Sequence, residues 1–235
     1  RAGKTNLLSH LSMDAIENGE CVVMLDFVDR CQASESVRKN FSEEQTLRIK
    51  FDDPDKIEGL GYNEASQFDD DRPFLQYDNC KQQTTNTIAL INSINDSNTA
   101  NDSRLSPRMG RYLESACLVV YASGGGITDV FEVLQDHNVR HAFIKKVPKQ
   151  LKEFIDKYCE YLYEIDEIDK KTGMIEGTKF NKIDGILDRL SIMNRNTYME
   201  LMLQKGTENN VNLVEEFQKN QLIVIEIPES LFSTQ

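Results

Sequence analysis

Gly3, Lys4 and Thr5 form the second half of a sequence pattern that binds phosphate groups. In the complete pattern, G-x-x-x-x-G-K-[ST], backbone N–H groups hold phosphate oxygens, the lysine reaches the β- and γ-phosphates and the hydroxyl ligates Mg²⁺. We therefore expect ATP and Mg²⁺ as ligands, with Thr5 binding the metal. The predicted nucleotide-binding residues are Arg1, Ala2, Gly3, Lys4, Thr5 and Asn6.

The pattern is incomplete at its start, because its first glycine would lie before Arg1. We therefore expect this sequence to be a fragment that begins inside the motif. The residues that follow fit the motif's usual setting. Leu7, Leu8, Leu11 and Ile16 predict a helix with one apolar stripe, Gly19 ends it, and residues 21–26 read as a buried strand. A chance Gly-Lys-Thr is the alternative, and this order of loop, helix and strand argues against it.

Two apolar runs end in an acidic residue. This is the pattern of the strand that supplies a second Mg²⁺ ligand in such nucleotide-binding sites. The first ends at Asp26, which is a candidate Mg²⁺ ligand or a residue lining the nucleotide cleft at the end of a neighbouring strand. The second ends at Glu226 and fits a core strand with one outward acid. A catalytic glutamate is expected beyond Gln235, so no residue of this chain is assigned as catalytic.

Composition narrows the class of protein. The 235 residues carry a formal net charge of −12, which argues against a generally basic DNA-coating surface but leaves room for a local basic channel. No apolar run is long enough to span a membrane. The five cysteines form no C-x-x-C pair, which fits a reducing cytoplasm and gives no zinc site. We expect a cytoplasmic protein.

Periodicity divides the chain into an α/β part and a helical part. Residues 1–80 hold the phosphate motif and two strands, the second at residues 45–51; residues 81–220 read as helices throughout; residues 221–235 return to a strand at 222–227. The predicted fold class is therefore α/β, with a large all-helical insertion between core strands. The strand at 222–227 is expected to share a sheet with the one at 21–27.

Other polar constellations have ordinary explanations. His137 and His141 are spaced to share a helix face, which suits a metal, but without an acid or cysteine partner, solvated histidines at a helix end explain them better. A lysine cluster, followed at once by acids, fits a solvated mixed-charge face; its members are Lys145, Lys146, Lys149 and Lys152. Phosphate or inter-subunit contacts are possible roles for three arginines, which are Arg104, Arg108 and Arg111.

The order of these parts resembles the HerA/FtsK superfamily of ring-forming translocating ATPases, which includes the coupling ATPases of type IV secretion. The resemblance is carried by Gly3-Lys4-Thr5, the strand ending in Asp26 and Gly61-Tyr62-Asn63-Glu64. It extends to the helical patterns at 106–113 and 128–134 and to the return at 213–217 before the last strand. It implies a RecA-like P-loop NTPase core, partial in this chain, that works in a homo-oligomeric ring, typically a hexamer.

The resemblance implies ATP hydrolysis at subunit interfaces, used by a helicase-type motor to translocate or process double-stranded DNA. A second possibility is a nucleotide-dependent ring scaffold that holds a partner nuclease or effector protein, for example in a phage-defence or secretion complex, with little DNA movement of its own. A small-molecule or nucleoside kinase is a third, for which so long a helical insertion is unusual. Neither an arginine finger nor a catalytic acid is identified in the sequence.

Overall fold

The computed structural model describes residues 2–28, 30–53, 72–98, 105–193, 200, 211 and 213–227. The chain forms two compact units, one made of residues 1–63 with 196–235 and the other of residues 64–195. The sequence analysis placed the domain boundaries at 80/81 and 220/221, which differ from the limits of these two units. The first of them would cut through a single helix that runs from Pro73 to Asn98. Arg1, Arg104 and Gln235, which the sequence singled out, lie outside the described residues.

The first unit contains a parallel three-stranded sheet. Its strands are β1 (Val22–Asp26), β2 (Thr46–Lys50) and β5 (Leu222–Glu226), in the order β1-β5-β2. Leu222 is level with Val22 on one side and with Thr46 on the other. This pairing confirms that the last strand shares a sheet with the first, as the apolar runs predicted.

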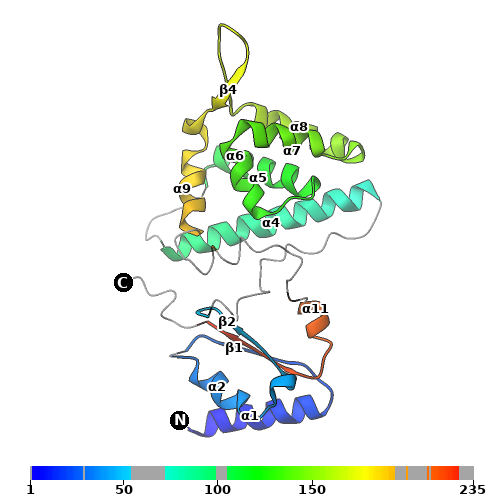
Figure 1. Cartoon of the computed structure of the whole chain (residues 1–235), viewed down its shortest axis with the longest axis vertical. Coiled ribbons are helices and arrows are strands. Elements are labelled where there is room, and N and C mark those ends of the chain that lie inside the picture. The colour runs from blue at the N-terminus through cyan, green and yellow to red at the C-terminus, as the bar shows by residue number, and fades with distance from the viewer. Residues whose placement is uncertain are drawn as a thin grey trace. The chain divides into compact units, whose positions relative to one another are not determined.

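Two helices cover one face of this sheet. They are α1 (Ala2–Glu17) and α2 (Gln32–Arg38), and both lie on the same side of the strands in Figure 1. The core between the two layers is formed by Ile16, Val37, Leu222 and Val224. The unit also contains a short 3₁₀ turn, η1 (Glu43–Gln45), and the short helix α11 (Leu213–Glu216) before β5.

Gly19 reverses the chain between α1 and β1. It has φ +89°, a conformation that side-chain-bearing residues rarely adopt, and its N–H donates to the carbonyl of Ile16 at 3.0 Å. The predicted helix end is therefore confirmed. Because the chain turns back here, α1 runs antiparallel to β1.

The apolar stripe predicted for α1 is not buried as expected. Leu7, Leu8 and Leu11 are 59%, 46% and 55% exposed, whereas Ser12 and Ile16 are the buried ones among the described side chains of α1. Only the second half of this 16-residue helix reaches the core formed with α2 and the sheet, because the three described strands make a narrow surface.

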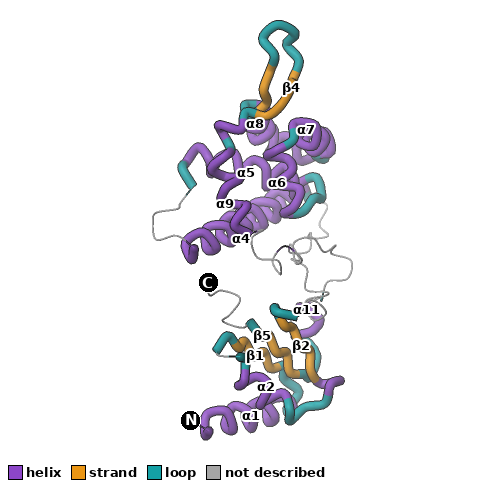
Figure 2. The backbone as a smooth tube through the Cα atoms, turned by 60° about the vertical axis from the view of Figure 1, so that its left-hand side comes forward, coloured by secondary structure: helices purple, strands orange, loops and turns teal. Residues whose placement is uncertain are grey.

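The second unit is mainly helical and is built around α5 (Pro107–Ala122). Ser106 caps its first turn by accepting from the Met109 N–H, and Pro107 occupies the first helical position. Ten of its 16 residues are buried, which are residues 112, 113 and 115–122. Figure 2 shows the surrounding helices, which are α4 (Pro73–Asn98), α6 (Ile127–Gln135), α7 (His137–Lys146), α8 (Lys152–Tyr163) and α9 (Asp184–Met193).

A β-hairpin interrupts this helical series and corrects the prediction of an all-helical insertion. Strands β3 (Asp166–Ile168) and β4 (Ile175–Thr178) pair antiparallel and project from the helices in Figure 1. The turn at the tip is closed by Gly173, which has φ +67° and donates its N–H to the Asp169 carbonyl. The sequence predicted a helix up to about Asp166, but α8 ends at Tyr163. The fold as a whole is mixed α/β.

Candidate functional site

The phosphate-motif residues occupy the first turn of α1. Gly3, Lys4 and Asn6 are exposed and Thr5 is partly exposed, so all four residues are accessible to solvent. An added Cβ at Gly3 would meet no atom within 4 Å, which leaves the backbone there accessible to a ligand. The structure therefore places these residues where their N–H groups, hydroxyl and ammonium group can reach a bound anion.

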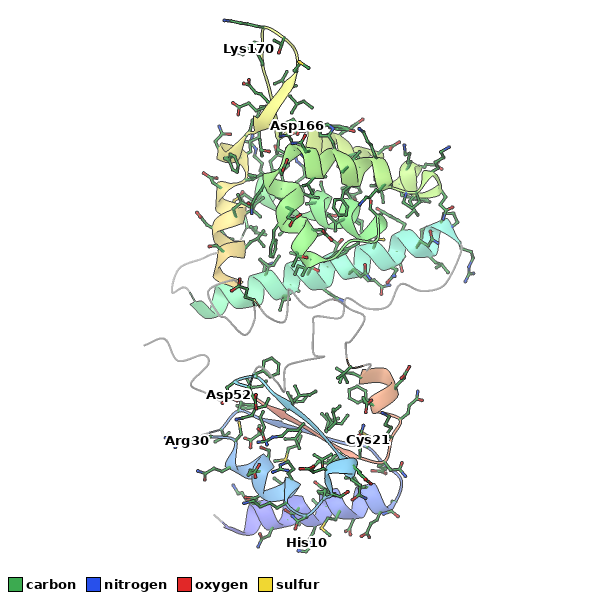
Figure 3. The ribbon with its side chains drawn as sticks, viewed as in Figure 1. His10, Cys21, Arg30, Asp52, Asp166 and Lys170 are labelled. Carbon is green, nitrogen blue, oxygen red and sulfur yellow. The ribbon has the colours of Figure 1, made fainter. Side chains whose placement is uncertain are left out.

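The direction of α1 brings this turn to one particular edge of the sheet. Figure 3 shows Cys21 at the edge where the strands begin, and Arg30 and Asp52 at the edge where they end, on the side of the first turn of α1. Free N–H groups and the positive end of the helix dipole thus lie on the side of the sheet where the carboxyl ends of parallel strands gather. In open α/β sheets this edge is where ligands bind.

Asp26 ends β1 at the same edge but already has two backbone partners. Its Oδ2 accepts from the Ser34 N–H at 2.7 Å and its Oδ1 from the Val28 N–H at 3.2 Å, and the residue is only 4% exposed. These bonds fix the connection from β1 into α2. Its carboxylate therefore has a structural role in the described residues, and its role as a Mg²⁺ ligand stays a prediction.

Glu226 lies level with Asp26 on the neighbouring strand and is paired with a cation. Arg48 donates to Glu226 Oε2 from Nε at 3.2 Å and from Nη2 at 2.9 Å, while Glu226 is 1% exposed. The Ser34 hydroxyl lies 3.4 Å from Glu226 Oε1, so Ser34 contacts both acids. The sequence analysis treated Glu226 as an outward acid, but it is buried, because β5 is the central strand with α2 covering this face.

Cys31 is part of the same corner and has an unusual backbone. It begins α2 with φ 54° and is buried, with its Sγ 3.2 Å from the Asp26 carbonyl. Burial, together with the negative charges of Asp26 and Glu226, raises the pKa of the Cys31 thiol. The thiol is thus kept neutral and unreactive.

We predict that Asp26→Asn lowers the stability of the first unit with no metal present. The amide keeps one acceptor oxygen but places an N–H₂ group opposite a backbone N–H, so a buried donor loses its partner at a cost of about 1–3 kcal/mol. Urea denaturation in EDTA measures this. The exposed Asp14 on α1 supplies the matched control, and its replacement by asparagine is expected to leave stability unchanged. Equal stability of Asp26→Asn and the parent chain in EDTA would contradict the structural role.

The second unit has a buried ionic cluster that the sequence did not reveal. Arg140 is fully buried and donates to Asp166 Oδ1 from Nε at 2.9 Å and from Nη2 at 2.7 Å. The same guanidinium donates to the Thr178 hydroxyl and to the carbonyls of Val133 and Leu134. Asp166 stands at the base of the hairpin (Figure 3), so this cluster joins α7 to both strands.

His141 completes this cluster, and the two predicted histidines have different surroundings. His141 Nε2 lies 2.7 Å from Asp166 Oδ2, whereas His137 Nδ1 lies 3.9 Å from Asp136 Oδ1. Across the described residues, no group of three or more histidines, cysteines, aspartates or glutamates is placed to hold a metal ion. The acid partner of His141 could not be found from spacing, because it comes from a strand 25 residues away.

The remaining sequence candidates lie on the surface. Arg111 lies over the Tyr161 ring at 4.5 Å and pairs with Glu164 at 3.0 Å, and Arg108 is exposed 6.0 Å from the Tyr112 ring centroid. The lysine cluster is exposed as well, at Lys145, Lys146, Lys149 and Lys152. These residues belong to the second unit, whereas the first turn of α1 belongs to the first.

Two further findings bear on the kind of protein. Within the described part of the chain, no helix has both the length and the apolar character needed to cross a membrane. All five cysteines carry free thiols. Compared with known proteins, the chain matches no protein-family model, no curated protein and no solved structure.

Proposed function

We propose that this chain contributes the nucleotide-binding part of a P-loop ATPase with a RecA-like core. One observation carries the proposal: Gly3, Lys4 and Thr5 form the first turn of a helix that runs antiparallel to a parallel sheet. That turn offers N–H groups, an ammonium group and a hydroxyl on the side where the strands end. These are the groups that the β- and γ-phosphates of ATP and a bound Mg²⁺ require.

Asp26 has a secondary part in this proposal. Its carboxylate accepts hydrogen bonds from two backbone N–H groups and so fixes the loop between β1 and α2 at the carboxyl edge of the sheet. Mg²⁺ coordination would then fall to Thr5 and to waters, since Mg²⁺ keeps several waters and usually takes few protein ligands.

The finer proposal is a HerA/FtsK-type ring that hydrolyses ATP to move double-stranded DNA, and it rests on the sequence resemblance. A physical argument supports it. A phosphate loop alone is half of an ATPase site, and phosphoryl transfer gains from positive charge on the γ-phosphate, often an arginine supplied in trans. A closed homo-oligomer, such as a hexamer, meets that need at every interface. The alternative is a cytoplasmic ring scaffold for a partner nuclease or effector.

Light scattering of the full-length protein with ATP and Mg²⁺ tests the ring. We expect a nucleotide-dependent closed oligomer with ATPase activity, and a monodisperse monomer with full activity would contradict it. Binding to long duplex DNA separates the two versions of the proposal. A translocase should bind with affinity that falls steeply as salt rises, because phosphate contacts release counterions. No DNA binding at low salt would favour the scaffold.

A further inference from the structure

A polar cavity in the helical unit has no part in the nucleotide proposal. It measures about 310 Å³ and lies between the first half of α4, the end of α5 and the 3₁₀ turn η2 (Lys149–Leu151). This volume is at the lower end of the range of small-ligand sites, about 300–1,000 Å³. All its walls belong to one compact unit, so the cavity is formed by this unit alone.

The chemistry of the walls is neutral and rich in carboxamides. Four of the described lining residues are Gln76, Asn79, Gln83 and Gln150, and no described lining residue carries a formal charge. Cys80 also lines the cavity, and burial raises the pKa of its thiol to about 11, so it is uncharged at neutral pH. Without a cation in the wall, an ionised phosphate has nothing to balance its charge.

Asn79 differs from the other polar groups of the cavity. It is only 8% exposed, and its carboxamide has no hydrogen-bond partner in the described part of the chain. By contrast, Gln150 donates to Gln76 at 3.0 Å and the Ser123 hydroxyl donates to the Phe143 carbonyl at 3.0 Å. Polar groups inside proteins are normally paired, so the Asn79 carboxamide is left available to a partner that enters the cavity.

A flat aromatic ligand fits this site poorly. Tyr121 is the aromatic residue of the lining; it is 3% exposed, and its hydroxyl lies 2.6 Å from that of Thr87. No ring face of the described lining is therefore open for a nucleobase to stack on, which is the usual source of affinity for bases. An amide group needs no such platform, because a carboxamide offers it one donor and one acceptor side by side.

We propose that this cavity binds an uncharged stretch of polypeptide, of which one extended residue pairs its backbone N–H and C=O with the Asn79 carboxamide. Asn79 Nδ2 donates to the carbonyl oxygen of that residue and Oδ1 accepts from its N–H, because these two groups of an extended residue lie on the same side of the chain, whereas those of a single trans amide point apart. The other carboxamides of the wall provide further amide contacts. This site is independent of the nucleotide proposal and does not require ATP.

NMR titration of the 235-residue chain tests the site, with N-acetylglutaminamide as the probe because it carries only neutral amides. We expect saturable shifts of the Asn79 side-chain N–H₂ signals and at least a tenfold loss of affinity in Asn79→Leu. The matched control is Asn86→Leu, which changes the same residue type on an exposed face of the same helix. That variant is expected to bind the probe like the parent chain.

Thermal unfolding of the same variants gives an independent readout. Because the Asn79 carboxamide has no protein partner, Asn79→Leu and the smaller Asn79→Ala are expected to keep a midpoint at or near that of the parent chain. A large fall of the midpoint in both variants would show that Asn79 supports the fold and would overturn the proposal. So would unchanged probe binding in Asn79→Leu, no saturable shift, or tighter binding of adenosine or inorganic phosphate than of the amide probe.

Discussion

Replacing Lys4 by alanine is expected to abolish ATP binding and turnover by the full-length protein while leaving its unfolding transition unchanged. Lys4 is exposed in the first turn of α1, so its removal costs little packing. Each hydrogen bond to a charged group contributes about 1.5–3 kcal/mol, and a lysine bound to two phosphates makes more than one. We therefore expect affinity to fall on the order of 100-fold or more. Calorimetric titration with ATP and Mg²⁺ measures this.

Lys39→Ala is the matched control for that variant. Lys39 is also exposed and belongs to the same unit, but it follows the end of α2 rather than starting α1. Its loss should leave ATP affinity unchanged. If Lys4→Ala and Lys39→Ala bind ATP equally well, Gly3-Lys4-Thr5 is a chance occurrence and the nucleotide proposal fails.

The largest effect on stability is expected for Arg140→Met. This change leaves Asp166, which is 2% exposed, buried with its strongest partner removed. Breaking a buried ion pair in this way costs about 3–5 kcal/mol. The second unit should therefore unfold at much lower urea concentration, and circular dichroism of the helices will report it. The exposed Arg108→Met provides the comparison and should change stability by about 0.5 kcal/mol or less.

A double variant separates the lost pair from general damage to the core. Arg140→Met combined with Asp166→Asn removes both charges, so it should be more stable than Arg140→Met alone, with a favourable coupling energy in the cycle. If the two changes simply add, the ion pair is not what holds the base of the hairpin, and the carbonyl contacts of Arg140 with Val133 and Leu134 would carry the effect.

Local sequence signals predicted much of the fold. Two apolar runs and one alternating segment located the three described strands of the parallel sheet, and Pro107 located the start of α5. The hairpin was missed because its strands have only three and four residues, which is too short for alternation to stand out within a region that otherwise reads as helical. Gly173 was the one local turn signal in that stretch, and it marks the tip of the hairpin.

The candidate site divides in the same way. Gly3, Lys4 and Thr5 were found because their spacing is fixed along one short segment. The hydrogen-bond partners of the buried acids Asp26 and Glu226 could not be predicted, because they depend on how β1, β5 and α2 pack together. The exposure of Leu7 and its neighbours was missed as well, because periodicity gives the face of a helix but not the width of the sheet beneath it.

The central position of β5 has a consequence for how the protein is made. Strands β1 and β2 emerge early in synthesis, but within the described sheet each pairs only with β5, which is translated after the whole helical unit. Residues 64–195 are contiguous and rich in local contacts, so they can fold while the backbone hydrogen-bonding groups of β1 and β2 are still unpaired. Ribosome-bound chains that stop before Leu222 should therefore recruit chaperones at their N-terminal segment and lose that interaction once β5 is released.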